Sequence, residues 1–174
     1  MHAFPELIDR CAAFTLSALE EAQARTIEAL QTSGATTLVK TLQMVQLQKV
    51  VTAVGMFSIF DALLQDRLGC AEGLKEAAEI LKGQGARELE GRFENLRLAV
   101  NVLKHGEGRS YRDLLEKQAL PFRIKRPDEA FFNEGDVSKV STLIEVDDAF
   151  VMNCAATIRQ VADAIQRARP EFIA

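Results

Sequence analysis

The sequence has few of the residues from which metal sites and disulfide frameworks are built. Its three cysteines are widely spaced and odd in number (Cys11, Cys70 and Cys154). They match neither a zinc-binding pattern nor a disulfide framework, so we expect them to be reduced and mostly buried. There are only two histidines, and neither belongs to a Glu-x-x-His pair of the kind that binds metal in helical bundles. We therefore expect no metal and no cofactor.

Motifs of several common enzyme classes are also missing. The short GQG and GEG stretches cannot form a Gly-rich phosphate loop, and there is no Gly-x-Ser-x-Gly nucleophile elbow. No basic stretch followed by an apolar core stands at the N-terminus, so we expect no secretion signal. The longest apolar stretch, 50–64, is interrupted by polar residues and is shorter than the roughly 20 residues of a membrane span. We expect a cytoplasmic protein with no membrane association.

What the sequence does contain is helical periodicity along most of its length. Apolar residues recur at three- and four-residue intervals over 4–31, 36–68, 72–82, 86–105 and 148–168, and one or two turns are predicted at 111–118. The middle of 36–68 is apolar on nearly every side, which predicts the central, most buried helix. A chain of 174 residues is long enough for one buried core. The fold class is therefore all-α, a bundle of about five helices in one domain, 1–174.

The helical period is lost before the last helix, where prolines and an Asn-Glu-Gly sequence indicate an irregular excursion. Within it, PFRIK (121–125) and STLIEV (141–146) are candidates to pair as a small β-hairpin. Either Asp147 or Asp148 is suited to cap the N-terminus of the final helix.

Charge is distributed unevenly along the chain. The net charge is −4, which argues against a general coat for nucleic acid, yet residues 92–126 hold nine Lys/Arg against four Asp/Glu. This basic belt, with a local charge of +5, could attract an anionic partner. The alternative is a solvated face that acidic residues from elsewhere balance in three dimensions.

The helix over 86–105 carries two stripes of side chains. One is apolar with a seven-residue repeat suited to packing along a neighbouring helix (Leu89, Phe93, Leu96, Val100 and Leu103). Beside it, Arg97, Asn101 and His105 are successive i, i+4 neighbours, so their side chains can converge on one patch. Imidazoles titrate near neutral pH and exchange protons with hydroxyl or phosphate oxygens. Together with Lys104, this patch has the parts needed to cleave a phosphodiester without metal.

The stretch KHGEGRS (104–110) also has a purely structural interpretation. Lysine and histidine in a last helical turn favour the negative end of the helix dipole, and Gly106 can supply the left-handed residue that ends a helix. Ser110 followed by Asp113 is then a capping box for the next short helix. Residue spacing leaves both interpretations open.

A long helix that ends in Asn-x-x-x-His, in an all-α chain rich in Phe and Leu, resembles the HEPN superfamily. MFSIFDALL (56–64) is similar to the aromatic-rich second helix of those proteins, and the resemblance covers about residues 36–168. The resemblance implies a helical bundle that is often dimeric. It also implies a metal-independent ribonuclease of the kind found in toxin, phage-defence and RNA-processing systems.

The resemblance assigns roles to particular residues of this chain. His105 takes the place of the catalytic histidine and Asn101 that of the polar residue in the motif, whereas Val100 stands where the family has arginine. Arg97 lies one turn earlier, seven residues from His105 rather than at the usual spacing. We expect catalysis from His105, Arg97 and Asn101, with substrate binding by the side chains that flank them (Lys104, Arg109 and Tyr111).

Some HEPN toxins are silenced by nucleotidylation, and the tyrosine used for this normally lies two residues after the histidine. Glu107 holds that position here, and Tyr111 lies further along the chain. The expected partners are RNA, a second copy paired through the seven-residue stripe, and a protein such as an antitoxin or nucleotidyltransferase. The main alternative is an inactive helical module for protein–protein interaction, which the missing arginine at Val100 favours. A third alternative is a helical bundle that binds a small ligand. No residue pattern in this chain favours it.

Overall fold

The structure, a computed structural model, describes residues 4–127, 140 and 142–172. Within these residues the chain is an all-α bundle (α1 Phe4–Leu30, α2 Thr36–Leu68, α3 Gly73–Gly83, α4 Arg87–His105, α5 Arg109–Leu115 and α6 Asp148–Ala168). The five long helices begin and end within one residue of the predicted positions, which confirms the all-α class. The turns expected at 111–118 form the short helix α5. Most of the irregular excursion, 128–139, lies outside the described residues.

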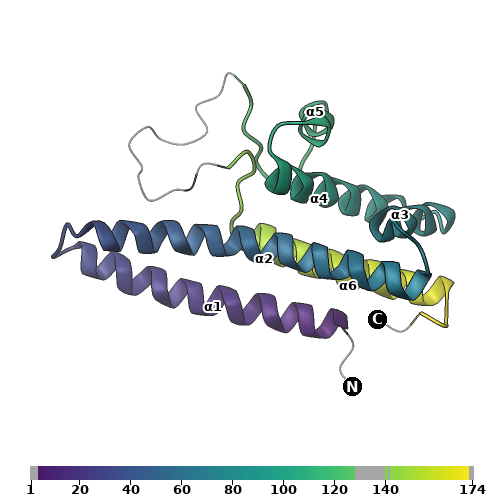
Figure 1. Cartoon of the computed structure of the whole chain (residues 1–174), viewed down its shortest axis with the longest axis horizontal. Helices are drawn as coiled ribbons and strands as arrows, with labels where there is room; N and C mark the ends of the chain where they lie inside the picture. Colours follow the sequence, from purple (N-terminus) through teal and green to yellow (C-terminus); the bar gives the residue numbers. More distant parts are fainter. Residues whose placement is uncertain (1–3, 128–139, 141, 173–174) are drawn as a thin grey trace.

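The helices form three layers, and α2 and α6 lie side by side in the middle one (Figure 1). Helix α1 packs against both of them on one side. Helices α3 and α4 pack against both on the other side, and α5, among the described helices, contacts only α4. The end of α4 that carries His105 is therefore separated from α1 by the middle layer.

Local contacts explain where two of the helices begin. The Asp147 carboxylate accepts a hydrogen bond of 2.7 Å from the Phe150 backbone N–H, so Asp147 is the N-cap of α6, one of the two residues predicted. Helix α3 has no side-chain cap of its own. Instead Asp61 of α2 accepts a hydrogen bond of 2.9 Å from the Leu74 N–H. Gly73 permits this approach, because a Cβ there would stand 2.6 Å from the Asp61 carbonyl oxygen and the Leu64 Cβ.

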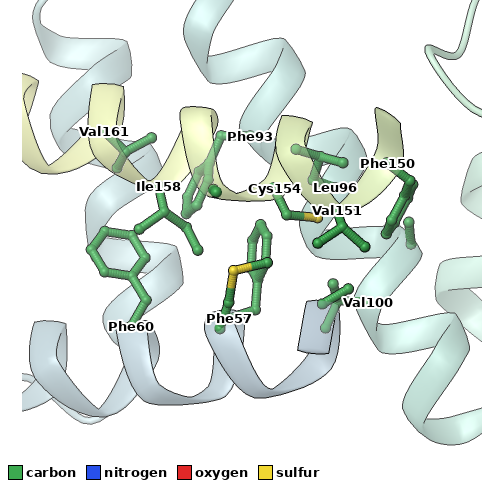
Figure 2. Close-up of a cluster of buried hydrophobic side chains, with 14 of the residues drawn as sticks. Phe57, Phe60, Phe93, Leu96, Val100, Phe150, Val151, Cys154, Ile158 and Val161 are labelled. Carbon is green, nitrogen blue, oxygen red and sulfur yellow. The ribbon is translucent and has the colours of Figure 1, made fainter. Parts of the chain in front are cut away.

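The core lies where α2, α4 and α6 meet (Figure 2). Phe57 of α2 stacks on Phe93 of α4 with ring centroids 6.1 Å apart, and Cys154 and Ile158 of α6 lie fully buried beside them. Burial raises the pKa of the Cys154 thiol, which stays protonated. All three cysteines are free, as predicted, but only Cys154 is buried, and Cys11 is exposed on α1. The prediction of mostly buried cysteines is therefore wrong.

The most buried helix is α6, and the prediction that assigned this role to 36–68 is wrong. Ten of the 21 residues of α6 are buried, against seven of the 33 residues of α2. Helix α2 lies in the middle layer, but only one face of it is covered, and several of its apolar side chains remain exposed. Apolar content alone cannot tell covered faces from uncovered ones.

Among the described residues, α2 is the one helix long and apolar enough to cross a membrane by length and composition. The polar residues that interrupt 50–64 were expected to make this stretch too short for a span, yet they do not interrupt the helix. Many core helices pass the same test, and about a third of the most apolar window of α2 is buried. The test therefore gives only weak evidence about a membrane.

The two segments proposed as a hairpin do pair, although only over a single antiparallel bridge between Ile124 and Ile144. The Lys125 N–H donates to the Leu143 carbonyl at 2.9 Å, and the Glu145 N–H donates to the Arg123 carbonyl at 3.0 Å. Neither described segment forms a regular strand. This bridge returns the chain to the bundle just before α6 begins.

Candidate functional site

The site begins at the turn between α4 and α5. Gly106 ends α4 with φ +74°, a positive φ that glycine adopts more readily than other residues, and its N–H donates to the Val102 carbonyl at 2.8 Å. The predicted capping box does not form, because Gly108 occupies the N-cap position and Ser110 already lies inside α5. The turn is short as a result, and it holds the start of α5 beside the end of α4.

An open hollow of about 250 Å³ lies at this turn, and side chains and backbone from both helices line it (Asn101, His105, Gly106, Gly108, Arg109 and Ser110). The His105 imidazole is exposed, as is its neighbour Lys104. The side chain of Arg109 is 90% exposed, and its Nε lies 3.9 Å from the Asp113 carboxylate. The fold thus brings Asn101, His105 and Arg109 together in a place open to solvent.

Arg97 lies on the same side of α4, but its guanidinium is turned toward another residue. Its Nε and Nη2 atoms donate to the two carboxylate oxygens of Glu94 at 2.8 and 2.7 Å. This hydrogen bonding to Glu94 raises the pKa of Arg97 above its ordinary value. This bidentate pair occupies the two N–H donors of Arg97 that could otherwise bind a phosphate. The structure therefore brings Asn101 and His105 together but does not bring Arg97 to the same hollow.

Arg97 instead lines a hollow of about 190 Å³ bordered by α2, α3 and α4, and a second hollow of about 450 Å³ between α3 and α4. Four glutamates surround the larger one, and only two cations oppose them (Glu72, Glu79, Glu90 and Glu94 against Lys75 and Arg97). Asn101 separates this acidic region from the His105 hollow, since it lines both the smaller hollow and the one at the turn. The carboxylates disfavour an anion on the Arg97 side of Asn101, whereas on the His105 side Arg109 lines the hollow and pairs with Asp113.

The basic belt of 92–126 does not act as one face. Arg92 donates from Nη2 to Gln160 of α6 at 2.8 Å, in the seam between the layers, and Arg97 is held by Glu94. The belt cations at the turn, Lys104 and Arg109, remain exposed. The two interpretations of the belt therefore apply to different parts of it, since some cations are balanced locally and others are available.

Tyr111, expected to bind substrate, is buried in α5 with 6% of its surface exposed. Its hydroxyl donates to the backbone carbonyl of Lys125 at 2.6 Å, and burial raises the pKa of the phenol. The side chain thus ties α5 to the segment that forms the single β-bridge. A role for Tyr111 in substrate binding stays a prediction.

Val100, which stands at the family's arginine position, is 3% exposed and belongs to the core. Phe93 and Leu96 of the same stripe are fully buried, and Leu89 and Leu103 are partly buried against the core. This stripe cannot pair with a second copy, so the predicted route to a dimer is wrong. The dimer itself stays a prediction.

Two features of the structure were not found from the sequence. Ser110 lines the His105 hollow. Its position next to Arg109 in GEGRS could have indicated from the sequence that it belongs to the site. Lys49 is 8% exposed, and its ammonium meets the Asp148 carboxylate at 2.7 Å, beside a hollow of about 180 Å³. Lys49 is the only charged residue between Thr41 and Phe60, which could have marked it as an ion-paired lysine.

Comparisons with models of known protein families, with curated proteins and with solved structures gave no match. The resemblance to the HEPN superfamily therefore rests on the residues of this chain alone. Among the described residues, no group of three or more His, Cys, Asp or Glu side chains is placed to hold a metal ion.

Proposed function

We propose that this protein is a HEPN-like helical protein that binds RNA at the α4–α5 turn and cleaves it without metal, within a toxin–antitoxin or phage-defence system. One observation carries the proposal. His105, Asn101 and Arg109 line the same solvent-open hollow, with Lys104 exposed beside it. A proton-transfer group, a hydrogen-bonding amide and two unburied cations are thereby gathered at a place where a phosphodiester can approach.

The chemistry follows from these groups. The neutral His105 imidazole would take the proton of an RNA 2′-hydroxyl as its oxygen attacks the neighbouring phosphorus. The bond from phosphorus to the 5′-oxygen then breaks, the leaving oxygen takes a proton from water, and a 2′,3′-cyclic phosphate remains. Asn101 would orient the imidazole or the substrate. Lys104 and Arg109 would hold the phosphate and stabilise its growing negative charge.

This assignment moves the cationic role away from Arg97. The guanidinium of Arg97 is paired with Glu94 on the acidic side of Asn101, whereas Arg109 lines the His105 hollow and Lys104 precedes His105 in the last turn of α4. Val100 cannot supply the charge, because valine is apolar, and its side chain belongs to the core. We therefore propose that Lys104 and Arg109 replace the arginine of the HEPN motif.

The second candidate is a catalytically inactive module that binds another protein, such as an antitoxin or a nucleotidyltransferase. The observation in its favour is the same departure from the motif, since Val100 is buried and Arg97 is bound to Glu94. The two candidates differ in whether the His105 hollow contacts RNA. Both are compatible with a cytoplasmic location, which we propose from the sequence.

RNA affinity tests the proposal. In the double variant Lys104→Glu/Arg109→Glu, we expect the affinity for a fluorescently labelled single-stranded RNA to fall by about tenfold or more. The plot of log affinity against log salt concentration should also become less steep, by about 1.4 in slope, or about 0.7 for each lost phosphate contact. Fluorescence anisotropy across a salt series measures both quantities.

The matched control is Lys40→Glu/Arg167→Glu, which makes the same change in net charge at two exposed cations outside the turn. It should bind RNA almost as the unmodified chain does. Equal losses in both double variants would mean only a general attraction between charges. No measurable RNA binding, together with normal growth of cells that overexpress the protein, would favour the interaction module.

A further inference from the structure

Helix α2 exposes an apolar face that the bundle leaves uncovered. Met44, Leu47, Val51 and Ile59 are each between 50% and 57% exposed. Steps of three, four and eight residues place them on one side of a helix with 3.6 residues per turn. This side faces away from the buried stripe of α2, which packs against the other helices of the bundle.

Helix α1 extends this surface. Leu7 is 49% and Phe14 is 77% exposed, and they are seven residues apart on a stripe that begins at Phe4. The ring of Phe4 stacks on Phe60 of α2 with centroids 6.2 Å apart, so the start of this stripe lies against α2. We call these six side chains the α1–α2 face (Leu7, Phe14, Met44, Leu47, Val51 and Ile59). They are six of the eight large exposed apolar side chains among the described residues.

Charge narrows the kind of partner that can cover this face. Between Thr41 and Phe60 the only charged residue is Lys49, which is buried and paired with Asp148. The α2 part of the surface therefore presents no charge, and it offers nothing to an anionic partner such as RNA. A second copy of the same surface, in contrast, meets it without repulsion, as a two-fold interface requires.

The pattern of side-chain sizes on α2 also fits a second copy. Met44, Leu47, Val51 and Val54 follow the 3-4-3 spacing of a helix-pairing seam. In an antiparallel pair of α2 helices with the two-fold axis at Val51, Leu47 lies opposite Gly55 and Met44 lies opposite Ser58. Met44 and Leu47 thus each face a small residue, whereas Val51 meets its own copy at the axis and Ile59 lies opposite Gln43. A Cβ added at Gly55 would have no atom within 4 Å, so there is room beside it in the free chain.

The size of the surface is compatible with a stable dimer. Residues 44–59 rise about 22 Å along α2 at 1.5 Å per residue, or about 30 Å with the side chains at each end. Two helices about 10 Å apart present a width of about 20 Å. The resulting area, roughly 600 Å² on each protomer, gives about 1,200 Å² in total, which reaches the lower end of specific interfaces.

We propose that two copies of this chain form a dimer through the α1–α2 face, with their α2 helices antiparallel and crossing at Val51. This surface replaces the stripe on α4, which the core already uses. The inference does not depend on RNA binding, because none of the six side chains lines the His105 hollow.

The test measures the mass of the particle in solution. The unmodified chain is expected to elute with a mass twice 19.2 kDa in size-exclusion chromatography with light scattering. Val51→Glu should weaken the dimer by about a hundredfold or more, because two carboxylates would then meet at the axis. Since Val51 is exposed in the single chain, the helical circular dichroism should not change. Met152→Glu on α6, which is 40% exposed outside the face, is the matched control and should remain dimeric.

Disulfide trapping locates the axis. In a chain with Cys11→Ser, the further change Val51→Cys should give a cross-linked dimer on mild oxidation, whereas Met152→Cys should not. A monomeric unmodified chain, or a dimer that survives Val51→Glu, would overturn the proposal. Flotation of a monomeric chain with phosphatidylcholine vesicles, lost in Val51→Glu, would overturn it as well and would assign the face to a lipid surface.

Discussion

Replacing His105 with alanine is expected to slow RNA cleavage in EDTA by a factor of about 10² to 10⁴, the usual contribution of a general acid or base. His105 supplies the one imidazole among the described residues that line the hollow, and imidazoles are the side chains most often used for proton transfer. The helix should be unaffected, because His105 is exposed and is the last residue of α4. The measurement is the initial rate of product formation from single-stranded RNA by purified protein.

Arg97→Ala is the informative comparison for this experiment. Because its guanidinium is bound to Glu94 and lines a different hollow, we expect a much smaller loss of rate than in His105→Ala. Cleavage that continues unchanged in His105→Ala would contradict the assigned role and would point to a contaminating nuclease. A loss in Arg97→Ala as large as that in His105→Ala would return the cationic role to Arg97.

Gly73→Ala is expected to lower the free energy of unfolding by about 2–4 kcal/mol, which combines overpacking with the loss of a helix cap. The new Cβ would stand 2.6 Å from both the Asp61 carbonyl oxygen and the Leu64 Cβ, and neither atom is the end of a flexible side chain. Helix α3 must then move away from α2. That movement would break the hydrogen bond from the Leu74 N–H to the Asp61 carboxylate. Urea denaturation followed by circular dichroism measures the change.

Gly91→Ala is the matched control for Gly73→Ala. Gly91 lies exposed inside α4, and a Cβ there would meet no atom within 4 Å. We expect this substitution to raise the free energy of unfolding by about 0.5–1 kcal/mol, because alanine favours a helix over glycine. Equal effects of the two substitutions would show that close packing of α3 on α2 does not matter.

Most of the fold could be predicted from the sequence because its helices obey local rules. Three- and four-residue apolar spacing located every long helix, and Gly106 and Asp147 were correctly expected at helix ends. Which face of a helix is covered depends on the whole arrangement, and here the prediction was wrong. The apolar character of α2 suggested that it would be the most buried helix, whereas α6 buries ten of its 21 residues and α2 only seven of its 33.

The site was predictable in part for the same reason. Helical spacing correctly placed Asn101 and His105 on one side of α4 and beside the same hollow. It could not show that Arg97 would turn toward Glu94, because an arginine has many rotamers and its neighbours compete for it. Nor could it show that the turn after Gly106 would bring Arg109 and Ser110 of α5 back to His105.

The most direct measurement of the central claim follows the His105 imidazole during RNA binding. The chain has only two histidines, so its proton NMR spectrum should contain two imidazole Hε1 signals, and His105→Ala identifies the one from the α4–α5 turn. We expect that signal to shift saturably as single-stranded RNA is added and to return as salt is raised. RNA that binds by anisotropy while the His105 signal stays in place would contradict the account.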